Sequence, residues 1–195
     1  MSTEDDDIKA MADRTAMASP PEGAAALAVA VIQGATAVIE SVARNSMASW
    51  PDAGGAAIQA GSLRARAHRA GRATVRAYRA ARALLEEGAH TERTGRDAAL
   101  RAALIEAADR LLEIAAAGGD AAHLAAEIAS RCEPAWRADA AGASALAAAA
   151  ARTATGLLEV NLALSAADPR RRQAYAIVAV ADAAQHRARE AVGDG

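Results

Sequence analysis

The sequence predicts an all-α protein, and three observations support that prediction. Alanine, the residue with the highest helix propensity, makes up about a third of the chain. Aromatic residues are only 2% of the chain, and phenylalanine is absent. Strand-forming residues such as valine, isoleucine and threonine do not cluster in alternation with polar residues. We therefore expect up to six helices and no sheet.

The composition also predicts one globular domain. The 195 residues are 53% hydrophobic and 24% charged, which allows a real core. We expect an acidic, disordered lead over residues 1–7 and a single helical domain over residues 8–193. An alanine methyl buries little area, and burial contributes only about 25 cal/mol per Å². A lone bundle of such helices would be marginal, so we expect a homodimer.

The charge, the start of the chain and the cysteine count argue against a nucleic-acid-binding, secreted or membrane-spanning protein. The net charge of −2 shows no basic excess for nucleic acid. The acidic start is unlike a signal peptide, and no run of about 18 purely apolar residues suggests a membrane span. The single cysteine, Cys132, fits a reducing compartment. We expect a soluble, cytoplasmic protein.

The first half of the domain is predicted to hold three helices. A short helix over 8–17 ends at the segment 19–23, which is rich in proline and glycine. A second helix over 24–48 is apolar on almost every side as far as Ile39, which predicts burial. A third helix over 56–87 follows a turn at residues 50–55.

The third helix has two different faces. Its apolar face includes Thr74 and Tyr78, so the threonine hydroxyl is expected to point inward. The opposite face is a stripe of arginines: Arg66, Arg69, Arg72, Arg76 and Arg79. The stripe could bind anions, but a solvated helix exterior is the commoner explanation of a charged face, and we favour it.

The second half of the domain is predicted to hold three more helices. One covers 98–131, after a loop at 88–97, and the glycines at 118 and 119 are expected to break or bend it. The next begins after residues 132–134 and runs to about residue 164. The last covers 170–192. Asp168 is its expected N-cap and Pro169 its first helical residue.

Few residues carry a recognisable chemical signature. The chain lacks CxxC, HExxH, GxSxG and P-loop motifs, and its four histidines are scattered, so we expect no metal and no cofactor. Asp139 opens a long helix, where a carboxylate serves either as a cap or as a group beside a pocket. Asn161 lies about six turns after Asp139, which is about 33 Å along a straight helix. One subunit therefore cannot bring Asp139 and Asn161 into the same site.

One segment resembles a known family. "RADAAGASALAAAAARTATGLLEVNL" is similar to the S-D-A-G-V-A-A-L…R-G-A-A-L…N-L segment of the cyclodeaminase/cyclohydrolase family, which includes the C-terminal domain of formiminotransferase-cyclodeaminase and methenyltetrahydrofolate cyclohydrolases. Asp139, Leu146, Arg152, Asn161 and Leu162 align without a gap. Weaker similarities cover nearly the whole chain.

The resemblance implies a fold and a chemistry. The fold would be an orthogonal bundle of helices that dimerises. The substrate would be a one-carbon tetrahydrofolate, whose formimino group is cyclised with loss of ammonia or whose methenyl bridge is opened by water. Both reactions need proton transfer at nitrogen. Asp139 would be catalytic, and Arg137 and Arg152 would bind the substrate.

The resemblance also assigns residues at two positions where this chain departs from the family. The family's Gly-rich loop P-G-G-G-S is here "PPEGA", which places Glu22 and Gly23 beside the substrate. The family's acidic D-E-D-A-x-A-Y is here "RATVRAY", so Thr74 takes the place of a carboxylate and Tyr78 that of the tyrosine. We assign Thr74 as catalytic and Tyr78 as substrate-binding.

Three functions remain open at this point. The first is a folate cyclodeaminase or cyclohydrolase. The second is a diverged relative that performs a non-folate cyclisation, ring opening or elimination. The third is a non-catalytic helical dimer.

Overall fold

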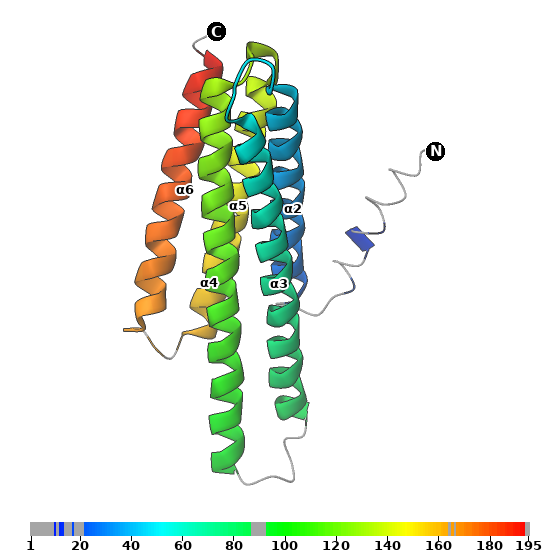
Figure 1. Ribbon diagram of the computed structural model, residues 1–195. Helices are drawn as coiled ribbons and strands as arrows, with labels where there is room; N and C mark the ends of the chain where they lie inside the picture. The colour runs from blue at the N-terminus through cyan, green and yellow to red at the C-terminus, as the bar shows by residue number, and fades with distance from the viewer. Residues whose placement is uncertain are drawn as a thin grey trace.

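The computed structural model describes residues 22–86, 93–163, 165 and 167–193, together with Ala10, Ala12, Asp13 and Met17, and omits the side chains of residues 93 and 94. Five long helices occupy this part of the chain (Figure 1). They are α2 (Glu22–Asn45), α3 (Ala53–Glu86), α4 (Arg93–Arg131), α5 (Arg137–Asn161) and α6 (Pro169–Gly193). A single 3-10 turn, Pro134–Trp136, joins α4 to α5.

The helices form an antiparallel bundle, so the predicted all-α fold class is confirmed. Helices α2, α4 and α6 run in one direction and α3 and α5 in the other (Figure 1). The helices lie lengthwise beside one another in this view. Helices α3 and α4 have 34 and 39 residues, against 24 or 25 in the others. The end of α3 and the start of α4 therefore extend past the rest of the bundle.

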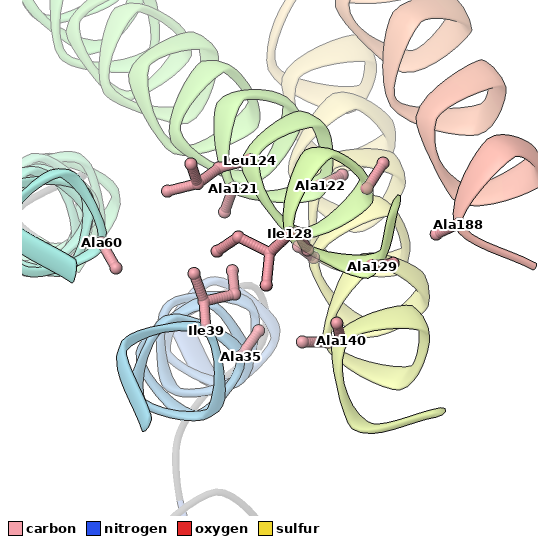
Figure 2. Packing of buried hydrophobic residues seen from close by; sticks show 14 of the residues in the cluster. Ala35, Ile39, Ala60, Ala121, Ala122, Leu124, Ile128, Ala129, Ala140 and Ala188 are labelled. Atoms are coloured by element: carbon pink, nitrogen blue, oxygen red, sulfur yellow. The ribbon is translucent and has the colours of Figure 1, made fainter. Parts of the chain in front are cut away.

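The core consists mainly of alanine methyls and divides into two clusters along the bundle. The first cluster lies near the turn between α2 and α3; there Ile39 and Ile128 point toward one another among alanines of α3, α5 and α6 (Figure 2). The second cluster is built around Leu111, Ile114 and Leu158. Because alanine side chains are short, neighbouring helix backbones can approach closely.

The two glycines of α4 do not break the helix, and the prediction of a bend there is wrong. Helix α4 is continuous from Arg93 to Arg131. A Cβ atom at Gly118 would lie 2.9 Å from the carbonyl oxygen of Ala147 in α5. A Cβ atom at Gly119 would lie 2.9 Å from Cγ2 of Ile177 in α6. The glycines therefore allow α4 to approach α5 and α6 closely at these two positions.

The predicted start of α6 is confirmed. Helix α6 begins at Pro169, and the Asp168 carboxylate accepts a hydrogen bond from the backbone N–H of Arg170 at 3.0 Å. That N–H has no partner within the helix, so the carboxylate acts as the N-cap. Asp168 also pairs with the Arg170 guanidinium at 2.8 Å.

Other boundaries differ from the predictions by a few residues. Helix α3 begins at Ala53, inside the predicted turn, and α4 begins at Arg93, inside the predicted loop at 88–97. Helix α5 ends at Asn161, three residues before the predicted end. The acidic lead lies outside the described residues, as does most of the predicted helix over 8–17.

Helix α2 is the one described helix long and apolar enough, by length and composition, to cross a membrane. Its buried side chains pack inside the bundle: Ala35, Ile39 and Val42 belong to the first cluster and Ile32 to the second. The core helix of a soluble protein shows the same composition. The cytoplasmic location stays a prediction.

Candidate functional site

Asp139 lies in the first turn of α5 and is exposed. A carboxylate there interacts favourably with the positive end of the helix dipole. Neither of the two cavities described below is lined by Asp139. In a single chain Asp139 is therefore a first-turn carboxylate that interacts with the helix dipole, while Trp136 occupies the N-cap position of α5 and no side chain makes a capping hydrogen bond there.

Thr74 is fully buried, so the prediction that it faces inward is confirmed. Its hydroxyl donates a hydrogen bond of 2.9 Å to the carbonyl oxygen of Ala70, one turn earlier in α3. The hydroxyl proton is thus already used within the helix.

A single chain does not bring Asp139 and Thr74 together. Asp139 adjoins Ala140, a member of the first cluster, whereas Thr74 lies between Ala70 and Ala77 of the second cluster. The first cluster also contains Ala56, near the start of α3. Eighteen residues of helix separate Ala56 from Thr74, which is about 27 Å. The two residues therefore occupy different halves of the bundle.

The two predicted substrate-binding arginines both connect α5 to α6. Arg152 forms an ion pair with Asp182. Arg137 donates from Nη1 to the carbonyl oxygen of Ala191 at 3.4 Å, and its Nε is buried without a partner among the described residues. A cation suits the carbonyl end of α6. Both side chains therefore have a structural role in the single chain.

The remaining predicted binding residues lie at the start of α2 and in the second half of α3. The Glu22 carboxylate is 13% exposed and lies 3.5 Å from Nη1 of Arg82 and 3.8 Å from Nε of Arg79. Gly23, the next residue, is buried. Tyr78 is buried in the second cluster. These residues lie in the half of the bundle opposite to Asp139.

Tyr78 and Asn161 form a polar pair inside this half. The amide Nδ2 of Asn161, the last residue of α5, donates a hydrogen bond to the Tyr78 hydroxyl at 3.0 Å. Burial raises the pKa of Tyr78, and the hydrogen bond from Asn161 partly offsets that rise. The phenol is therefore neutral at physiological pH and can itself donate.

The largest of the described cavities opens beside Asn161. It has a volume of about 750 Å³ and lies between the start of α4 and the end of α5, where α4 extends past its neighbours. Its apolar walls are Leu100, Leu104, Ile105, Val160 and Leu162. Its polar groups are Asp97, Arg101, Asn161 and Ser165.

This arrangement can bind a small molecule with an apolar or ring-shaped body. Cavities of about 300–1,000 Å³ with mostly apolar walls and a few polar groups are typical ligand sites. With its Nδ2 bonded to Tyr78, the Asn161 amide keeps an oxygen that accepts hydrogen bonds from a ligand N–H. Asp97 and Arg101 are exposed at the rim and provide one charge of each sign.

Sequence reasoning missed most of these cavity residues. It noted Asn161 but did not place it in a site. The signal in the sequence that could have located them was the length of the third and fourth predicted helices. Leucines that continue past the ends of the other helices have no helix to pack against, so they can line a cavity instead. Among the described residues no three His, Cys, Asp or Glu side chains are grouped as metal ligands.

Comparison with known proteins finds similarity at the level of the fold. The chain matches no protein-family model. No curated protein matches it in sequence. The solved structures with a similar fold include formiminotetrahydrofolate cyclodeaminase from Thermotoga maritima, with a TM-score of 0.79 and 17% identity over 100% of this chain and 96% of that one. The fold therefore resembles that of a folate cyclodeaminase along its whole length.

Proposed function

We propose that the chain is an enzyme of the cyclodeaminase type that acts on a one-carbon tetrahydrofolate or a similar C–N ring substrate. The single observation that carries the proposal is the whole-length similarity in fold to an enzyme of this activity. The 750 Å³ cavity supports it, because it has room for a ring system and polar groups to orient one.

In this proposal the cavity between α4 and α5 binds the substrate. Its leucines contact the faces of the ring, and Asn161 accepts a hydrogen bond from a ring N–H. Cyclisation with loss of ammonia requires a proton on the departing nitrogen, and hydrolysis requires a base for the attacking water. Asp97 at the rim is the cavity residue able to perform such a transfer.

Asp139 stays a proposed catalytic residue under one condition. Its carboxylate is exposed in a single chain, so it can take part only where a second copy of the chain covers it. The same holds for substrate binding by Arg137 and Arg152, which lie on the same helix. Thr74 can be catalytic only if its hydroxyl gives up the hydrogen bond to the carbonyl oxygen of Ala70. Glu22, Gly23 and Tyr78 would bind the substrate from the half of the bundle opposite to Asp139.

A folate turnover assay tests the proposal. Purified protein is given 5-formiminotetrahydrofolate, and the absorbance of methenyltetrahydrofolate and the release of ammonia are followed; hydrolysis of methenyltetrahydrofolate is measured separately. We expect Leu104→Trp, which fills the cavity, to lower the turnover about tenfold or more. The control Leu146→Trp alters an exposed leucine outside the cavity and should keep full activity.

Two results decide against parts of the proposal. If the protein neither binds nor turns over any reduced folate, the folate chemistry is wrong. If Asp139→Asn abolishes turnover while Leu104→Trp retains it, the site lies at the other end of α5.

One observation favours a second candidate function, ligand binding without catalysis. Both charged cavity residues, Asp97 and Arg101, are exposed, and Asp97 lies 3.7 Å from Nε of Arg96. Asp97 is the one carboxylate among the residues that line the cavity, so no second acid is placed there to share a proton transfer with it. Saturable folate binding without turnover would establish this function.

A further inference from the structure

The arginines of α3, both those of the stripe and the neighbouring Arg64 and Arg82, differ in their ion pairs. Arg64 and Arg82 are eighteen residues apart, which is five full turns, and both face α2, where they pair with Glu40 at 2.5 Å and Glu22 at 3.5 Å. Arg66 faces the other way and bonds Asp120 of α4 at 2.7 Å. These three arginines fix α3 between its neighbours.

Arg72 and Arg76 behave differently. Both are exposed, and neither has a carboxylate within 4 Å among the described side chains. They are four residues apart, so their side chains lie on the same side of the helix. Arg79 follows on the same side of the helix, and its Nε lies 3.8 Å from the Glu22 carboxylate.

These arginines line a groove of about 350 Å³ between α2 and α3, which lie side by side in Figure 1. The apolar wall of the groove is Ala26, Val29 and Val75. His68 closes one end. The groove thus combines positive charge with an apolar surface.

His68 is oriented as a donor. Nε2 of Gln33 lies 3.3 Å from Nδ1 of His68. With the Gln33 amide in this orientation, Nδ1 accepts from the amide nitrogen and the neutral ring carries its proton on Nε2. That N–H adds a neutral donor to the guanidinium groups of the groove.

We propose that the groove between α2 and α3 is a binding site for a small phosphorylated ligand, with the charged phosphates on Arg72, Arg76 and Arg79. Arginine forms bidentate hydrogen bonds with phosphate oxygens. Arg72 and Arg76 contribute two positive charges, and the group of Arg79, Arg82 and Glu22 contributes one more. The resulting net charge of +3 suits a di- or triphosphate. An apolar part of the ligand lies on Val29 and Val75. The low net charge of the whole chain favours such a small anion over a nucleic acid.

Calorimetric titration with inorganic tripolyphosphate at low salt tests the site. We expect saturable binding at one site, which weakens as KCl is raised. Arg72→Gln and Arg76→Gln should each weaken binding about tenfold, the loss of one charged hydrogen bond. The control pair Arg172→Gln and Arg189→Gln makes the same charge change at exposed positions on α6 and should leave the affinity unchanged.

Three outcomes would overturn the proposal: no saturable binding at millimolar tripolyphosphate, equal weakening by the α3 and α6 variants, or equal affinity for citrate, a multivalent anion whose charges are on carboxylates instead of phosphates. None of these measurements involves folate or the cavity between α4 and α5. Failure here therefore leaves the proposed function unchanged.

Discussion

At the residue scale, the polar pair of Tyr78 and Asn161 is the feature that connects the core to the candidate site. The pair joins the second half of α3 to the last residue of α5. Asn161 also lines the 750 Å³ cavity. A hydrogen bond in this position fixes the end of α5 and the shape of the cavity wall together.

Removing the amide should destabilise the protein. In Asn161→Ala the Tyr78 hydroxyl is left buried without its partner, which costs about 1–3 kcal/mol of unfolding free energy. Urea denaturation measures the loss. Asn45→Ala is the matched control, because the Asn45 amide is exposed and donates to the carbonyl oxygen of Ser41 in its own helix. Equal losses of unfolding free energy in the two variants would show that the hydrogen bond to Tyr78 does not stabilise the protein more than an exposed bond does.

Stability should also fall in alkaline solution. Burial raises the pKa of Cys132 above 9.0 and that of Tyr78 above 10.0. The folded state therefore holds these protons more tightly than the unfolded state. The free energy of unfolding has its full value below the unfolded pKa values, and it declines as the pH rises above 9 for Cys132 and above 10 for Tyr78.

The contribution of Tyr78 can be isolated. Unfolding free energies measured from pH 8 to 11 should decline less steeply above pH 10 in Tyr78→Phe than in the wild type. Tyr175→Phe should change the slope less, because Tyr175 is exposed and solvent screens its bond to Glu159. Identical slopes in wild type and Tyr78→Phe would contradict the assignment.

At the element scale, helix spacing is set by small residues. Gly118 illustrates this, since a Cβ there would lie 2.9 Å from one backbone atom of α5 and 3.1 Å from another. Sequence reasoning took the same glycine for a helix breaker because glycine has a low helix propensity. Nothing in a linear pattern distinguishes a glycine that ends a helix from one that lets a second helix approach. By contrast, Asp168 and Pro169 were predicted correctly, since capping depends on local backbone groups alone.

Substitution by alanine separates these two roles of glycine. Gly118→Ala should destabilise the protein by about 1–3 kcal/mol, because backbone atoms of α5 cannot move aside. Gly142→Ala in α5 should stabilise it by about 0.5–1 kcal/mol, because that position has nothing within 4 Å and gains helix propensity. Thermal denaturation of both variants measures the difference. A stabilising Gly118→Ala would show that the helices are not in close contact there.

At the scale of the whole molecule, the bundle is long and its core is thin. The core alanines are fully buried, but each contributes only one methyl. Leu85 and Val160 remain exposed toward the extended ends of α3 and α4. The prediction of a homodimer follows from the same composition and stays a prediction.

Oligomerisation can be tested without locating an interface. A dimer coupled to folding makes the thermal midpoint rise with protein concentration. We expect that rise, together with a dimer mass in sedimentation velocity. A monomer mass, with a midpoint independent of concentration, would show that close alanine packing is sufficient on its own.

The sequence by itself determined the helical class, the approximate helix bounds and the cap of α6. These depend on propensity, periodicity and hydrogen bonds between neighbours in the chain. Only the tertiary structure decided which polar groups meet: it separated Asp139 from Thr74, joined Tyr78 to Asn161, and placed the cavity where α5 ends beside α4. The physical reason is that a contact between helices depends on their relative length, direction and rotation, and in an alanine-rich chain almost every helix face can pack against another.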